Sequence, residues 1–118
     1  MRRVQVLGVA AVLAVAAVVP AAVASRSAPP VVKVTAGKPG ELSFTLSKKT
    51  VPKGTVVFKV TNAGKDEHNF KIGGKKTPLL KSGKSATLTV TLKAGKAPFL
   101  CTVPGHALGG MKGALTVK

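Results

Sequence analysis

The sequence predicts an all-β protein, an antiparallel Greek-key β-sandwich of seven or eight strands, on three observations. Beyond residue 30, apolar residues alternate with Thr, Ser and Lys at a period of two, as expected for strands with one buried face. Gly- and Pro-containing turn signals separate these alternating runs. No stretch of this part of the chain has a convincing helical period, so a sandwich of short strands is the fold class that fits.

The first 30 residues precede the predicted sandwich. Arg2 and Arg3 are followed by an apolar run that ends at Pro20, and a small-x-small site ends at Ala24. The apolar run is short for a membrane span, which needs about 20 residues. This order is typical of a secretory signal peptide, with an uncleaved anchor as the alternative. We therefore predict a signal peptide over 1–24, a flexible leader over 25–30 and one domain over 31–118.

Within that domain, each alternating run places its apolar residues on one face. Val56, Phe58 and Val60 alternate with Val57, Lys59 and Thr61 in the clearest example. Branched threonines suit the outward face because branching at Cβ favours an extended backbone. The predicted strands cover residues 31–35, 42–46, 56–61, 69–72, 87–92, 98–100 and 112–117.

The composition is strongly basic, with 19 Lys and Arg against three Asp and Glu and a formal net charge of +16. Without Arg2 and Arg3, 17 basic side chains remain against three acidic ones, which gives +14. Nucleic-acid modules interleave arginine with aromatic residues for base stacking, and both are scarce here, so we expect no nucleic-acid partner. The positive charge predicts that the protein is steered toward an acidic protein face or an anionic membrane surface. The alternative is that the lysines only coat the polar strand faces and keep the protein soluble.

The chain has one cysteine, Cys101, which cannot form an internal disulfide. A single thiol in an exported protein requires burial, an intermolecular bond or a bound metal. His106 and Met111 follow it in the spacing Cys-x4-His-x4-Met, and the other histidine, His68, precedes the predicted strand 69–72. These scarce residue types therefore gather around one loop between two strands, and a sandwich can bring His68 to the same end.

This donor set matches the needs of one copper ion that cycles between Cu(I) and Cu(II). A thiolate and two imidazoles form a trigonal plane, with a weak and distant thioether on the axis. Pro104 and Gly105 can turn the chain so that His106 returns to the metal, and the 109–110 Gly pair can do the same for Met111.

Each of these residues also has an ordinary interpretation. Cys101 and Met111 are compatible with core packing, and His68 and His106 with polar loop positions. The sequence alone therefore leaves open a metal-free adhesive or ligand-binding sandwich. The coincidence of four scarce residue types at workable spacings favours the copper site.

The segments Cys101–His106 with Met111, and 51–64 leading to Glu67–Phe70, resemble the cupredoxins, the small blue-copper proteins, and most of all their plastocyanin/auracyanin-like branch. The resemblance covers residues 31–118. It implies equatorial ligands His68, Cys101 and His106 and an axial Met111. It also implies that Asn69 ties the two ligand segments together by hydrogen bonding.

The resemblance implies further that electrons leave through the edge of His106, within an apolar collar of Pro104, Ala107 and Leu108. One departure is Leu100, because the family often has an aromatic residue directly before the cysteine. Ala97 and Pro98 likewise replace aromatic residues, which leaves the packing and the electron path along that strand open.

We expect a monomeric electron carrier that works outside the cytoplasmic membrane, in the periplasm or extracellular space or at the outer membrane face. It would not be an enzyme, because protein donors fill all four metal positions. Its partners would be redox proteins with an acidic docking face. The alternative is a copper carrier or store that uses the same ligands.

Overall fold

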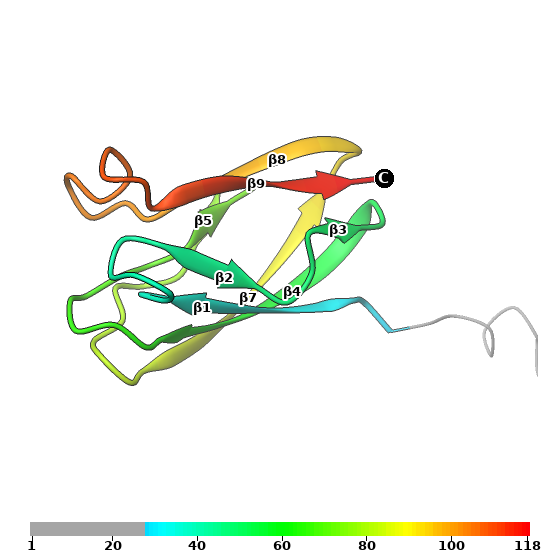
Figure 1. Cartoon of the computed structure of the whole chain (residues 1–118). Helices are drawn as coiled ribbons and strands as arrows, with labels where there is room; N and C mark the ends of the chain where they lie inside the picture. The colour runs from blue at the N-terminus through cyan, green and yellow to red at the C-terminus, as the bar shows by residue number, and fades with distance from the viewer. Residues whose placement is uncertain (1–27) are drawn as a thin grey trace, which may run out of the picture.

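The computed structural model describes residues 28–118, which form a sandwich of two β-sheets (Figure 1). The predicted signal peptide and the first half of the predicted leader, residues 25–27, lie outside the described residues. Nine strands occur over 28–118: β1 (Val31–Ala36), β2 (Phe44–Leu46), β3 (Thr50–Val51), β4 (Gly54–Asn62), β5 (Lys71–Ile72), β6 (Lys75–Lys76), β7 (Ser85–Leu92), β8 (Gly95–Leu100) and β9 (Lys112–Val117).

The first sheet has the order β2-β1-β4-β7. β4 and β7 pair antiparallel from Gly54↔Leu92 to Thr61↔Ser85, whereas β1 and β4 run parallel. The parallel pair arises because the chain crosses to the other sheet as β3 between them. β4 consequently starts at the same end of the sandwich as β1.

The second sheet has the order β3-β9-β8-β5-β6. β8 and β9 form its long antiparallel pair, and the two-residue β3 runs parallel to β9. The predicted all-β sandwich is confirmed, with two parallel pairs that make both sheets mixed. β5 is shorter than the predicted strand 69–72, and His68 before it forms an isolated antiparallel bridge with Leu80.

The core fills the space between the sheets and follows the predicted alternation. Val56, Phe58 and Val60 of β4 are buried. The buried residues Val32, Val34, Leu115 and Val117 of β1 and β9 join them. Phe70 lies at the centre, with ring centroids 5.3 Å from Phe58 and 5.4 Å from Phe99. Such aromatic packing stabilises the body of the domain beyond simple area burial.

Three loops meet at one end of the sandwich, opposite the end where the C-terminus lies (Figure 1). They connect β1 with β2, β4 with β5, and β8 with β9. The β8–β9 loop contains Cys101, His106 and Met111, and the β4–β5 loop contains His68. The fold therefore brings the predicted ligand segments to a common pole. Residues 28–118 contain no helix with the length and apolar character needed to cross a bilayer.

Candidate metal centre

Cys101 follows directly after β8 and is almost fully buried, at 1% exposure. Its backbone amide donates a hydrogen bond of 3.1 Å to the carbonyl of Met111. This bond closes the base of the loop at the point where β8 and β9 separate. The thiol is therefore held at the pole by the strand pair itself.

The loop from Cys101 to Met111 is shaped by turns that depend on glycine. Gly105 and Gly110 have φ angles of 86° and 112°, a backbone region that favours glycine. The amide of His106 donates to the carbonyl of Val103, and the amide of Met111 donates to the carbonyl of His106, both at 3.0 Å. The predicted turns are thus present, and they fold His106 and Met111 back toward Cys101.

His68 reaches the pole from the other side, between β4 and β5. Reciprocal backbone hydrogen bonds with Leu80 fix its position, at 3.2 Å and 2.8 Å. Its side chain is fully buried. A fully buried imidazole needs partners for its ring nitrogens, and both nitrogens have polar atoms within reach.

One nitrogen of each imidazole and the thiol converge on a single point. The donor atoms of His68, Cys101 and His106 all lie within 4.8 Å of one another. The two Nδ1 atoms are 3.2 Å apart, and Cys101 Sγ lies 4.0 Å from Nδ1 of His68 and 3.6 Å from Nδ1 of His106.

These separations can be tested against a shared metal ion. A first-row ion bonds imidazole nitrogen at about 2.0–2.1 Å and thiolate sulfur at about 2.3 Å. In a trigonal plane such bonds hold the donors about 3.5–3.8 Å apart. The observed distances fit this arrangement, and a set of two nitrogen donors and one sulfur donor suits copper.

Met111 completes the predicted set from within the pole. Its side chain is fully buried and packs in one apolar cluster with Cys101 and Ala36. Leu42 and Phe44 pack against the same cluster. The predicted axial donor therefore lies beside the thiol in surroundings that exclude water.

Asn69 contacts the opposite ligand segment through both ends of its side chain. Its Nδ2 donates to Thr102 Oγ1 at 2.7 Å, and Thr102 N donates to its Oδ1 at 2.8 Å. Asn69 follows His68 directly, and Thr102 follows Cys101. The structure therefore contains the cross-link that the family resemblance implied.

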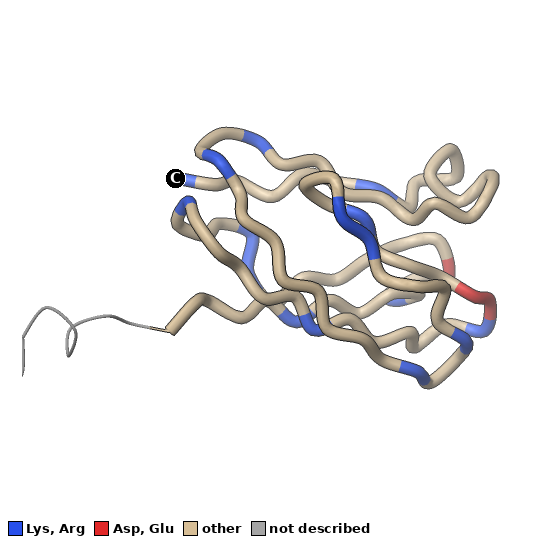
Figure 2. The backbone as a smooth tube through the Cα atoms, turned by 180° about the vertical axis from the view of Figure 1, so that it is seen from behind, with Lys and Arg blue, Asp and Glu red and all other residues tan. Residues whose placement is uncertain are grey.

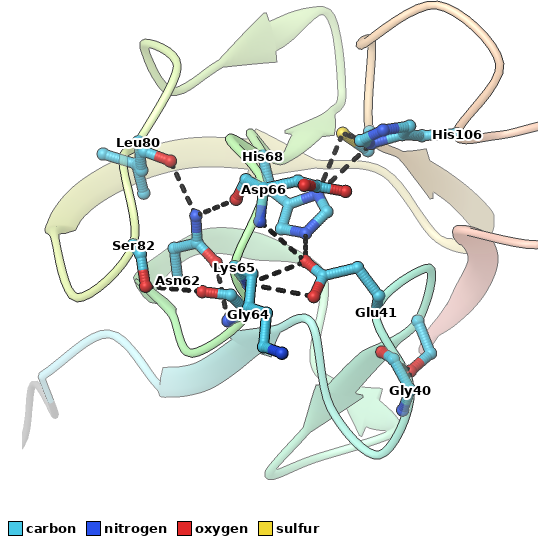
Figure 3. Close-up of polar contacts among 12 residues, drawn as sticks. Gly40, Glu41, Asn62, Gly64, Lys65, Asp66, His68, Leu80, Ser82 and His106 are labelled. Atoms are coloured by element: carbon cyan, nitrogen blue, oxygen red, sulfur yellow. Dashed lines mark hydrogen bonds and ion pairs between the residues drawn. The ribbon is translucent and has the colours of Figure 1, made fainter.

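Glu41 is a residue of this site that sequence reasoning missed. Its Oε2 lies 2.6 Å from Nε2 of His68, on the side of the ring away from His106 (Figure 3). The Lys65 amide above all, then the His68 ring and the Asp66 amide, lower the pKa of Glu41 to about 2. Glu41 precedes His68 by 27 positions in a different loop, so no local spacing pointed to it.

Asn62, at the end of β4, organises the turn that Glu41 contacts. Its buried side-chain amide donates to the carbonyls of Asp66 and Leu80, both at 2.7 Å, and its Oδ1 accepts from Gly64 N at 2.8 Å. These bonds hold the turn in the shape in which the amides of Lys65 and Asp66 point toward Glu41.

Charge is unevenly distributed around the pole. The three acidic residues, Glu41, Asp66 and Glu67, lie at this end, whereas lysines occur both beside them and over the rest of the domain (Figure 2). Residues 102–111 carry no charged side chain apart from the titratable His106. His106 is partly exposed, and Leu108 beside it is 93% exposed. The pole thus presents an uncharged, partly apolar tip.

A family model described as a Cupredoxin-like domain matches residues 8–117. Among curated proteins, Auracyanin-B of Chloroflexus aurantiacus is 48% identical over 42 residues, which are 35% of this chain and 18% of that protein. The copper-resistant cuproprotein CopI of Pseudomonas aeruginosa is 51% identical over 41 residues, 34% of this chain and 23% of that protein. These matches therefore span only about a fifth of the length of either relative.

Solved structures match over a larger part of the chain. Auracyanin B superposes with a TM-score of 0.68 at 26% identity, covering 79% of this chain and 92% of that one. Rusticyanin from Thiobacillus ferrooxidans superposes with a TM-score of 0.65 at 26% identity, covering 78% and 79%.

Proposed function

Because the chain belongs to the cupredoxin-like domain family, we propose that it is an exported blue-copper protein that carries single electrons between redox partners. One copper ion would be held by His68, Cys101 and His106, with Met111 as the weak axial donor. The observation that carries the proposal is the convergence of the two Nδ1 atoms and one Sγ within 4.8 Å.

Copper bound at this site would supply a one-electron couple between Cu(II) and Cu(I). The residues around it suit both oxidation states, because soft sulfur donors favour Cu(I) and imidazole serves both. Cys101 N, Met111 N and the Asn69 side chain hold the ligand backbone in fixed hydrogen bonds. A site that moves little between the two states has a low barrier to electron transfer.

The proposal includes no substrate chemistry. Four protein donors would occupy the metal, which leaves no open position of the kind that catalytic metal sites keep. The burial of Cys101, His68 and Met111 further limits access by small molecules. Electron exchange would instead pass through the partly exposed His106.

We propose that the redox partner docks against the tip around His106, where Pro104, Ala107 and Leu108 form an apolar collar. A groove of about 540 Å³ beside this tip is lined by Leu79 and Pro104, and also by the charged residues Asp66, Glu67 and Lys76. The lysine-rich body would steer a partner with an acidic docking face. Electron transfer should then slow as ionic strength rises.

The test is to supply the purified domain with Cu(II) and record its visible spectrum and reduction potential. An intense blue absorption with one copper per chain is expected, since a thiolate–Cu(II) bond produces it. Cys101→Ser should abolish the colour, because a hard hydroxyl cannot replace the thiolate. A wild-type protein that stays colourless, or a variant that stays blue, would refute the assignment.

Copper handling is the second candidate, and the local identity to the copper-resistant cuproprotein CopI favours it. A copper carrier or store would use the same four residues but exchange its ion. Competition with a chelator separates the two functions. A carrier releases copper readily, whereas an electron carrier retains it through repeated oxidation and reduction.

A further inference from the structure

We infer that Glu41 is a positioning residue for the metal site: its carboxylate fixes the tautomer and orientation of His68 and lowers the reduction potential of the bound copper. The claim about the potential rests on the proposed function. The claim about the tautomer concerns the protein alone and can be tested without copper.

The tautomer follows from the two contacts of the His68 ring. Nε2 lies 2.6 Å from Oε2 of Glu41, and Nδ1 faces Cys101 and His106 at 4.0 Å and 3.2 Å. An ionised carboxylate can only accept a hydrogen bond. The proton of a neutral ring therefore resides on Nε2, which leaves the Nδ1 lone pair directed into the site.

The carboxylate of Glu41 is itself held in place. Lys65 N donates to both of its oxygens, at 2.9 Å and 3.0 Å, and Asp66 N donates to Oε2 at 3.1 Å (Figure 3). Gly64 lies so close that a Cβ there would overlap the carboxylate. Backbone hydrogen bonds therefore hold the acceptor against the ring, independently of any metal.

This arrangement distinguishes the two imidazoles. In residues 28–118, His68–Glu41 is the only contact between a histidine and a carboxylate within ion-pair distance. A carboxylate that accepts from a ligating imidazole makes the ring more basic and adds negative charge near the metal. Both effects favour Cu(II) over Cu(I), so Glu41 lowers the reduction potential through His68 and not through His106.

The first experiment is nitrogen-15 NMR of the histidine rings of the metal-free protein at pH 9. Wild-type His68 should appear as the Nε2–H tautomer, with Nδ1 unprotonated. Finding the Nδ1–H tautomer in the wild-type protein would overturn the inference directly. This measurement needs no variant, so it holds even if substitution of Glu41 prevents folding.

The second experiment compares Glu41→Gln with Glu67→Gln. The control removes the same charge from an exposed residue that adjoins His68 in sequence. In Glu41→Gln we expect a mixture of His68 tautomers and an affinity for Cu(II) that is about tenfold lower. This lies within the range seen when a metal ligand loses its hydrogen-bond partner. If the affinity for Cu(I) is unchanged, a tenfold loss of Cu(II) affinity corresponds to a rise of about 59 mV in the reduction potential of this one-electron couple. Glu67→Gln should retain the tautomer and shift the potential less.

The outcomes separate this inference from the proposed function. Equal potentials for the two variants, together with an unchanged tautomer, would overturn the role of Glu41 while leaving a blue-copper site intact. A wild-type protein that binds no copper would refute the proposed function and with it the effect on potential. The tautomer measurement would still decide whether Glu41 orients His68.

Discussion

Asn69 and Thr102 are joined by two reciprocal hydrogen bonds, one from the Asn69 amide to the Thr102 hydroxyl and one from the Thr102 amide to Oδ1 of Asn69. The first residue follows His68 in the chain, and the second follows Cys101. The bond pair therefore links the two ligand segments one residue away from their donor side chains. It fixes the distance between an imidazole and a thiol that are 33 residues apart.

Asn69→Ala should break this link and leave the part-buried Thr102 amide without its acceptor. We expect a loss of about 1–3 kcal/mol in the free energy of unfolding of the metal-free domain and faster release of copper to a chelator. Urea denaturation and chelator kinetics measure the two effects. Thr102→Ser, which keeps both hydrogen bonds, is the control, and equal chelator kinetics for the wild type and both variants would show that the link is dispensable.

Gly64→Ala tests the close packing beneath Glu41. A Cβ at this position would overlap the Glu41 carboxylate and lie 3.1 Å from Cα of Gly37. We expect the carboxylate to be displaced from Lys65 and His68, at a cost of about 1–3 kcal/mol in unfolding free energy. Gly40→Ala, whose added Cβ would meet only Ser43 Oγ at 3.9 Å, should lose nothing. A loss no greater for Gly64→Ala than for Gly40→Ala would contradict this packing argument.

Phe58→Ala tests the inward face of β4. The ring is fully buried and packs against Phe70, so its removal should reduce unfolding free energy by about 3–5 kcal/mol. The neighbouring Val57 faces outward and is only partly buried, so Val57→Ala should cost well under half as much. Urea denaturation of the metal-free proteins compares them, and similar losses would contradict the assigned alternation.

Local patterns in the sequence predicted the features that nearby residues encode. The period-two alternation of Val56, Phe58 and Val60 located the buried face of a strand, and the spacing from Cys101 to Met111 located a ligand loop. Both depend on residues close together in the chain. The pleat of a strand and the reach of a turn translate such spacing directly into geometry.

The parts that sequence reasoning missed depend on contacts between distant segments. Glu41 meets His68 only because Gly37 and Gly64 allow the β1–β2 and β4–β5 loops to approach each other. The parallel pairing of β1 with β4 likewise depends on where the chain crosses between sheets. Leu42, expected in a strand, instead packs against the cluster around Met111. Nothing in the local residue order distinguishes these outcomes.

Met111→Leu should keep the copper and raise its reduction potential. Leucine fills a similar volume in the apolar cluster around Cys101 but offers no donor. Loss of the weak axial sulfur favours Cu(I), so redox titration should give a higher midpoint with the blue colour retained. Leu115→Met, a swap of similar size in the main core, should leave the potential unchanged. A lower or unaltered midpoint in Met111→Leu would exclude Met111 as the axial donor.

His106→Gly should create a site that external imidazole can enter. His106 is partly exposed at the tip of the domain, whereas His68 is fully buried and contacts Glu41. Removing the exposed ring opens a path from solvent to Cys101, and removing the buried ring leaves a cavity behind the loops. Added imidazole should therefore restore the blue spectrum of the Cu(II) form in His106→Gly.

The matched variant His68→Gly tests whether rescue by imidazole depends on the solvent exposure of the ring that was removed. Both substitutions delete one imidazole donor and differ mainly in the solvent access of the gap they leave. Restoration at position 106 and not at position 68 would identify His106 as the ligand that communicates with solvent, and therefore with a docked partner. If imidazole restores the blue spectrum of both variants equally, or of neither, the result contradicts electron transfer through His106. The proposed docking surface around Leu108 then loses its support.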